Sequence, residues 1–265
     1  MQWLVCLLHC NELPFRKFFS VVDRGQTTGP KSSTGEIASA LNFDPKDKPI
    51  AAFLPVPGKV IDISEDVKKD LSTDQLYFLR ACLAVEAGYQ ASQDIPFLQL
   101  AQPGNLSHAR WLTTGNRLLR LYMSTDSPPE TLKRITSFIV NFYGPAWFQI
   151  KLHCSCQDGP RNLFYMIQLC QDLDASDQEI ICPVLNNNNY FTHSENILLT
   201  AVGDINEDNR KYRIENFIAA REQLDPHDCN IRTFEKKNIA LNFSAASYLD
   251  IIDWTKCDVT PPPLL

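Results

Sequence analysis

The chain has 265 residues, of which 44% are hydrophobic and 21% charged, and its formal net charge is -6. This is the composition of a globular protein with a sizeable core, and one large domain or two small ones both fit the length. The acidic balance speaks against wholesale electrostatic binding of nucleic acid, and no stretch reaches the roughly 20 apolar residues of a membrane span, so we expect no membrane partner.

Residues 2–21 are predicted to form a helix that is buried on most sides, because apolar residues fill more than one stripe of it. Pro14 removes a hydrogen-bond donor, so we expect a kink or a break there. The apolar run from Met1 to Leu8 has no basic start and no small-residue cleavage site, so it does not match a secretory signal. We therefore expect an intracellular protein, in the nucleus or the cytoplasm, whose cysteines are reduced.

A short helix is predicted to end at Leu41. Residues 42–71 are rich in proline and polar turn residues, which predicts a linker or an excursion. Ser72 and Gln75 then have the spacing of a capping box, which predicts that a helix starts there and runs over 73–87.

Apolar periodicity and capping residues predict a series of further helices, and Gly144-Pro145 is expected to end one of them. In chain order these helices are 108–124, 130–143, 160–171, 176–186, 194–203 and 207–223. The last forty residues change character, with short alternating segments at 231–234 and 239–243 that predict extended chain.

Cys6 and His9, with Cys10 beside them, have the spacing of one pair of metal ligands. Zinc needs four ligands, or three and a water, and the other group would come from the distant segment 153–156. Neither spacing is that of a zinc finger, and cysteine is among the most frequently buried residue types. We therefore predict no metal site, with Cys6 and His9 as the candidates if one exists.

Catalytic signatures are missing from the sequence. It contains no nucleophile elbow, Walker loop, dinucleotide fingerprint or H-E-x-x-H zinc motif. Aspartates are scattered along the chain, and none has a spacing that marks a two-metal site. We expect no catalytic residues and no cofactor, with Mg²⁺ only at a nuclease site that the pattern does not reveal.

The most distinctive stretch runs from His108 to Arg120 and makes a local basic set in an acidic chain. One interpretation is a surface whose guanidinium groups grip nucleic-acid phosphates. The other, which we favour, is a solvated helix face with ion pairs inside the molecule. The candidates for nucleic-acid contact are Arg110, Trp111, Arg117 and Arg120.

Two segments resemble motifs of the hAT superfamily of DNA transposases. Cys6-Leu-Leu-His9-Cys-Asn11-Glu-Leu13 resembles the C-x-x-H-x-x-N-L segment of that family, and Arg110-Trp111-Leu-Thr113-Thr114 resembles its R-W-x-S-T segment. They occur in the expected order, with a helical stretch between them. Within the superfamily, the chain is most similar to uncharacterised transposon-derived proteins of invertebrates.

The resemblance implies an RNase H-like nuclease domain with a large helical insertion, in which three acids carry metal-dependent DNA cleavage and transfer. In the family two of these acids precede the first motif, whereas only five residues precede Cys6 here, none acidic. The resemblance therefore implies a mainly α remnant of that α/β fold, with a few short strands. Its parts would be a helical remnant of the core at 1–41, a linker at 42–71, a helical domain at 72–230 and an extended segment at 231–265.

Three functions follow from these expectations. The first is a non-catalytic, transposase-derived helical protein that retains weak DNA binding. The second is a helical protein–protein interaction module without a nucleic-acid role, and the third is a fragment of a metal-dependent DNA transposase or nuclease. If strands that once covered residues 2–21 are missing, the apolar surface left on that helix would drive self-association.

Overall fold

The computed structural model describes residues 7–27, 29, 32–59, 63–107, 110–155, 158–187, 200, 203–204, 206–222 and 241–252. Helices dominate these residues, which confirms the mainly α fold class, and extended chain pairs in them at an isolated antiparallel bridge between Leu241 and Ile252. The chain forms two compact units. The larger unit contains residues 8–152 and 173–181, and the smaller unit contains 1–7, 153–172 and 182–265.

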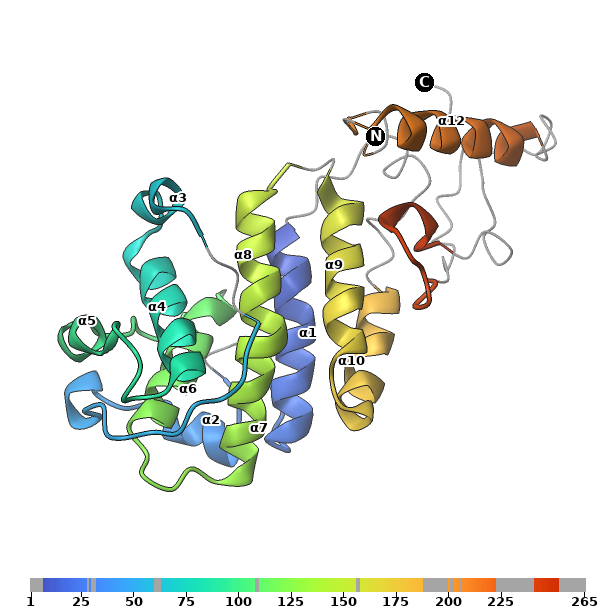
Figure 1. Cartoon of the computed structure of the whole chain (residues 1–265). Coiled ribbons are helices and arrows are strands. Elements are labelled where there is room, and N and C mark those ends of the chain that lie inside the picture. Colours follow the sequence, from blue (N-terminus) through green and yellow to red (C-terminus); the bar gives the residue numbers. More distant parts are fainter. Residues whose placement is uncertain are drawn as a thin grey trace. The chain divides into compact units, whose positions relative to one another are not determined.

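The helices of the two units are shown in Figure 1. In chain order they are α1 (Leu7–Val22), α2 (Glu36–Ala40), η1 (Pro45–Asp47), α3 (Glu65–Lys69), α4 (Thr73–Ala87), α5 (Ile95–Leu100), α6 (Trp111–Met123), α7 (Glu130–Phe138), η2 (Ile139–Tyr143), α8 (Gly144–Leu152), α9 (Gly159–Gln171), α10 (Ala175–Asn187), α12 (Glu207–Glu222) and η6 (Tyr248–Asp250). In the part that the structure describes, no helix is long and apolar enough to cross a membrane.

Helix α1 continues through Pro14, so of the predicted kink or break the break is wrong. Proline in a helix interior costs about 3 kcal/mol, but α1 buries Phe15, Phe18 and Phe19 almost completely, with 0–1% of each side chain exposed. Burying one such side chain contributes about 1.5–3 kcal/mol. Packing therefore offsets the cost of the lost hydrogen bond.

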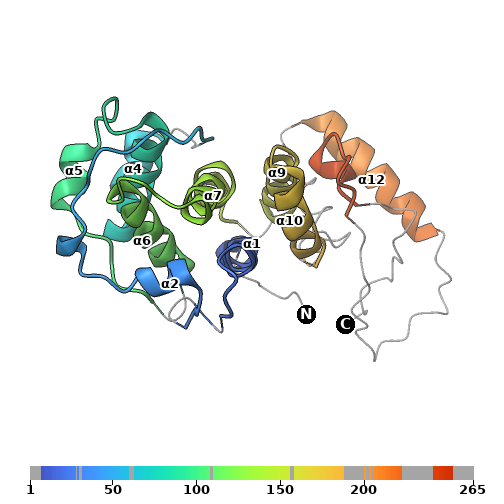
Figure 2. The ribbon, with the colours of Figure 1, turned by 90° about the horizontal axis from the view of Figure 1, so that it is seen from below.

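These phenylalanines meet rings from the long helix that runs from α7 to α8 (Figures 1 and 2). Phe15 stacks on Tyr143 at a centroid distance of 4.3 Å, and Phe18 stacks on Phe138 at 3.9 Å. The apolar face of α1 from Phe15 to Phe19 is thus covered by the chain's own helices. These side chains are therefore not part of an exposed apolar surface, and self-association through this helix stays a prediction.

The long helix does not stop at Gly144-Pro145 as predicted. Instead it widens into a π-turn, η2, in which the Gly144 N–H donates to the Ile139 carbonyl. The next donor in that register would be Pro145, which has no N–H. The Val140 carbonyl that it leaves unpaired accepts instead from the Lys59 N–H at 3.1 Å. A backbone donor from a distant segment therefore pairs with this carbonyl of the π-turn, and the helix continues as α8.

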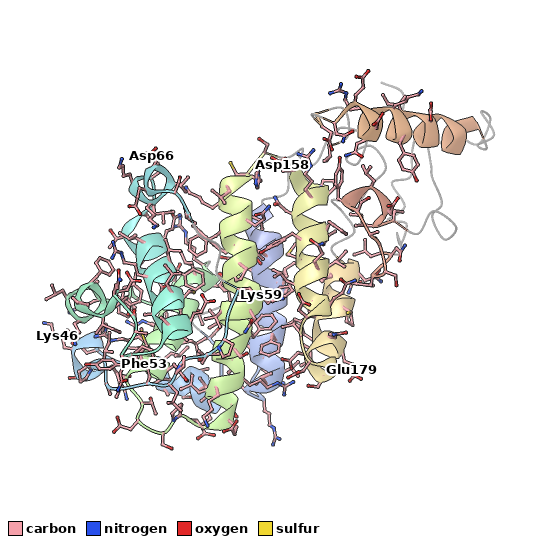
Figure 3. The ribbon with its side chains drawn as sticks, in the orientation of Figure 1. Lys46, Phe53, Lys59, Asp66, Asp158 and Glu179 are labelled. Carbon is pink, nitrogen blue, oxygen red and sulfur yellow. The ribbon has the colours of Figure 1, made fainter. Side chains whose placement is uncertain are left out.

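The donor, Lys59, belongs to an extended strap, residues 48–59, that crosses the larger unit (Figure 3 labels Phe53 and Lys59 on it). Its backbone bonds three helices: Ala51 N–H donates to the Met123 carbonyl, Val56 N–H to Val85 and Lys59 N–H to Val140. The residues described in the predicted linker at 42–71 lie inside the larger unit. The predicted domain bounds stay a prediction.

Helix α4 begins as the capping box predicts, since the Ser72 N–H donates to the Gln75 side chain at 3.1 Å. Helix α2 is capped from a distance, because the Asp23 carboxylate accepts from the N–H groups of Ile37 and Ala38 at 2.8 and 2.9 Å. Burial raises the pKa of Asp23, and these two hydrogen bonds oppose that rise. Helix α4 packs on α6, and α6 packs on α7.

In the smaller unit, α9 confirms the helix predicted at 160–171. The Arg161 guanidinium of α9 pairs with Asp204 at 3.1 Å, and the Tyr248 hydroxyl of η6 donates to the same carboxylate at 2.5 Å. Helix α12 confirms the prediction for 207–223, and α10 confirms that for 176–186. Of the other predicted elements, 231–234 and most of 194–203 lie outside the described residues.

Candidate functional site at the start of helix α6

The two motif segments of the sequence lie against each other at the first turn of α6. The Glu12 carboxylate of α1 accepts a hydrogen bond from the Trp111 N–H at 3.2 Å, although the two residues are 99 positions apart. Phe15, one helical turn further along α1, meets the Trp111 ring edge-on at 5.7 Å. Tertiary packing thus joins Asn11-Glu12 to Arg110-Trp111.

Glu12 acts as a remote cap of α6. The first N–H groups of a helix have no partner within it, and the residue at the N-cap position, Arg110, makes no side-chain cap. Burial raises the pKa of Glu12 from 4.5 to about 7, while the Trp111 N–H and the charge of Arg110 oppose the rise. The cap therefore changes its charge near neutral pH. A glutamate at position 12 does not by itself predict a cap for a helix so distant in the chain.

A set of buried polar groups lies among the aromatic rings beside this cap. Asn11 is fully buried, and its amide donates to the Tyr143 carbonyl at 3.4 Å. Within the described residues, no hydrogen-bond partner is found for Asn11 Oδ1, Thr114 Oγ1 or the Tyr143 hydroxyl. Burial raises the pKa of that hydroxyl well above its usual value. Polar groups without partners are costly inside a protein.

Arg117 is buried, with 3% of its surface exposed, and its guanidinium binds the protein backbone. Its acceptors are the carbonyls of Gly104 at 2.8 Å, Leu41 at 2.8 Å and Phe43 at 2.9 Å. The Asn105 side chain accepts a further hydrogen bond at 3.3 Å. Leu41 is the C-cap of α2, so the cation also meets the negative end of that helix.

Arg120, one helical turn later, is buried to the same extent, and its guanidinium also binds backbone carbonyls. It donates to the Lys48 carbonyl at 2.7 Å and to the Leu98 carbonyl at 2.6 Å. The solvated helix face expected of the basic set is therefore wrong for Arg117 and Arg120, whose guanidinium groups are buried and bind backbone carbonyls. Contact of these two residues with nucleic acid stays a prediction.

The remaining candidates divide between surface and core. Arg110 is exposed at the start of α6, while Trp111 is 5% exposed. Thr113 is also buried, donating to the Arg110 carbonyl at 3.0 Å and accepting from the Ser107 N–H at 3.2 Å. Of the four residues proposed for nucleic-acid contact, Arg110 is the exposed one.

Of the other motif residues, Cys6 lies outside the described residues, and for His9 the structure describes only the backbone, in α1. In the described part of the chain, no cluster of three or more His, Cys, Asp and Glu side chains has an arrangement that could hold a metal ion. No protein-family model, curated protein or solved structure matches this chain.

Proposed function

We propose that the chain is a helical protein–protein interaction module, non-catalytic and descended from a hAT-like transposase. The observation that carries this proposal is that the guanidinium groups of Arg117 and Arg120 donate hydrogen bonds to the chain's own backbone carbonyls. Glu12, the acid inside the first motif, likewise caps α6. Glu12, Arg117 and Arg120 thus hold the chain's own backbone in place.

The larger unit has apolar side chains that are exposed to solvent. Leu54 is 77% exposed and Leu100 is 87% exposed. The Tyr122 hydroxyl donates to the Leu54 carbonyl at 3.0 Å, and Arg120 holds the Leu98 carbonyl of the short helix that ends at Leu100. An apolar side chain on a fixed backbone loses little entropy on binding, so it suits a protein contact.

Descent from a transposase is supported by the contact between the two motif segments. Asn11 and Glu12 belong to the segment that resembles C-x-x-H-x-x-N-L, and Trp111 belongs to the one that resembles R-W-x-S-T. Glu12 and Trp111 share a hydrogen bond. A pair of motifs that meet in space fits one inherited structural unit.

The test is co-purification of partners with the tagged full chain from cells, comparing Leu54→Asp/Leu100→Asp with Val21→Asp. Val21 is 41% exposed on α1 and serves as the matched control. The proposal expects partners that bind the wild type and the control and are lost from the leucine variant, with unchanged circular dichroism. An identical set of partners on all three proteins would overturn it.

A second candidate is weak DNA binding through Arg110, favoured by the exposure of that side chain at the start of α6. Its test is titration of duplex DNA at low and high salt with wild type and Arg110→Ala. Affinity that falls steeply with salt and is lost in the variant would establish this candidate. Equal and salt-independent signals from both proteins would exclude it.

A further inference from the structure

Two cysteines of the smaller unit lie in contact across neighbouring helices. Cys170 is in the last turn of α9, Cys182 is in α10, and their Sγ atoms are 3.6 Å apart. A short turn at 172–174 joins the two helices. The contact thus links the end of one helix to the middle of the next.

The two thiols differ in their access to solvent. Cys170 is 1% exposed, whereas Cys182 is partly exposed. Burial, together with the neighbouring thiol, raises the pKa of Cys170 well above its usual value. A small reagent in solution therefore reaches Cys182 first, and Cys170 is placed to react with whatever forms there.

We propose that Cys170 and Cys182 are a redox modification site, a dithiol that small-molecule disulfides such as glutathione disulfide convert to a disulfide. A disulfide bond is about 2.05 Å long, so the sulfur atoms must approach each other by roughly 1.5 Å. Pro183 directly follows Cys182 and lacks the N–H that would bond the Glu179 carbonyl. The missing bond loosens α10 where that movement is needed.

The chemistry balances in two steps. The Cys182 thiolate attacks one sulfur of glutathione disulfide, forms a mixed disulfide and releases one glutathione thiolate. Cys170 then loses its proton and attacks the Cys182 sulfur, which forms the intramolecular bond and releases the second glutathione. The two cysteines lose two electrons, and one glutathione disulfide is reduced to two thiols.

Among the cysteines whose side chains the structure describes, we expect the disulfide to form between Cys170 and Cys182 and not at the others. Cys82 is fully buried, and burial raises the pKa of its thiol well above the usual value. Cys154 is exposed, and among the described thiols it has no partner in contact. It can accept a mixed disulfide but has no described neighbour to resolve it. Cys154→Ser is therefore the matched control.

The test uses the purified full chain, incubated with glutathione disulfide, alkylated, digested and mapped by mass spectrometry. We expect a cross-linked peptide joining Cys170 and Cys182 in the wild type and in Cys154→Ser, and its loss on reduction. In Cys170→Ser, Cys182 should keep its glutathione. Absence of the cross-link from oxidised wild type, or persistent glutathione on its Cys182, would overturn the proposal. Because the cross-link is mapped in the wild type, this result does not depend on whether a substituted protein folds.

Discussion

The Trp111 N–H donates to the Glu12 carboxylate at 3.2 Å and so ties the first turn of α6 to α1, 99 positions earlier in the chain. A charged acceptor at a helix start is stabilising, because it satisfies an unpaired donor and faces the positive end of the helix dipole. Burial of the same carboxylate works in the opposite direction. The balance between the two effects makes this contact depend on pH.

Stability should fall as pH rises through the titration of Glu12. Its pKa is about 7 in the folded chain against 4.5 for an ordinary glutamate, so the folded state binds more protons than the unfolded state between these values. The contribution is fully present below about pH 4.5 and is lost as pH rises through about 7. The Glu12→Gln variant should remove about 2 kcal/mol of this dependence.

Urea unfolding at about pH 5 and about pH 8 measures this effect. Val21→Thr, at an exposed position of α1 with no titratable side chain, is the control and should leave the pH dependence as in the wild type. If the stability of Glu12→Gln depended on pH as strongly as that of the wild type, the role of Glu12 as a titrating cap would be contradicted.

The strap should stabilise the π-turn through one backbone donor. Lys59→Pro removes the N–H that bonds the Val140 carbonyl, so we expect a loss of about 1–3 kcal/mol in the free energy of unfolding. Lys59→Ala keeps the N–H and should lose clearly less stability than Lys59→Pro. Equal losses from both variants would show that the side chain, and not the backbone bond, is responsible.

Two adjacent threonines of the second motif should respond oppositely to loss of their hydroxyl groups. No partner is found for Thr114 Oγ1 among the described residues, so Thr114→Val should stabilise the chain by about 1 kcal/mol. Thr113 Oγ1 makes two hydrogen bonds, so Thr113→Val should destabilise it by about 1 kcal/mol. Thermal unfolding of the pair measures both, and destabilisation by Thr114→Val would mean that its hydroxyl is engaged.

Local signals in the sequence predicted much of the helical framework. The capping box at Ser72 and Gln75 placed the start of α4, and apolar periodicity predicted 160–171, which the structure forms as Gly159–Gln171. In both cases the deciding interactions lie within a few residues along the chain. The mainly α fold class followed from the same reasoning.

Features that depend on distant partners could not be predicted from local patterns. Pro145 was expected to end a helix, but the Lys59 N–H bonds the carbonyl that the proline leaves unpaired. The spacing of Arg117 and Arg120 correctly put them on one helix, but spacing does not tell whether a cation faces solvent or carbonyls. The role of Glu12 likewise needs Trp111, which only the fold brings close.

The most direct test compares the free energies of unfolding of Arg110→Ala, Arg117→Ala and Arg120→Ala, each also titrated with duplex DNA. We expect losses of about 2–4 kcal/mol for Arg117→Ala and Arg120→Ala, because each leaves buried carbonyls without a donor, and a change within about 0.5 kcal/mol for the exposed Arg110. Unchanged stability in Arg117→Ala and Arg120→Ala, together with loss of a salt-dependent DNA affinity present in the wild type, would contradict the proposed function.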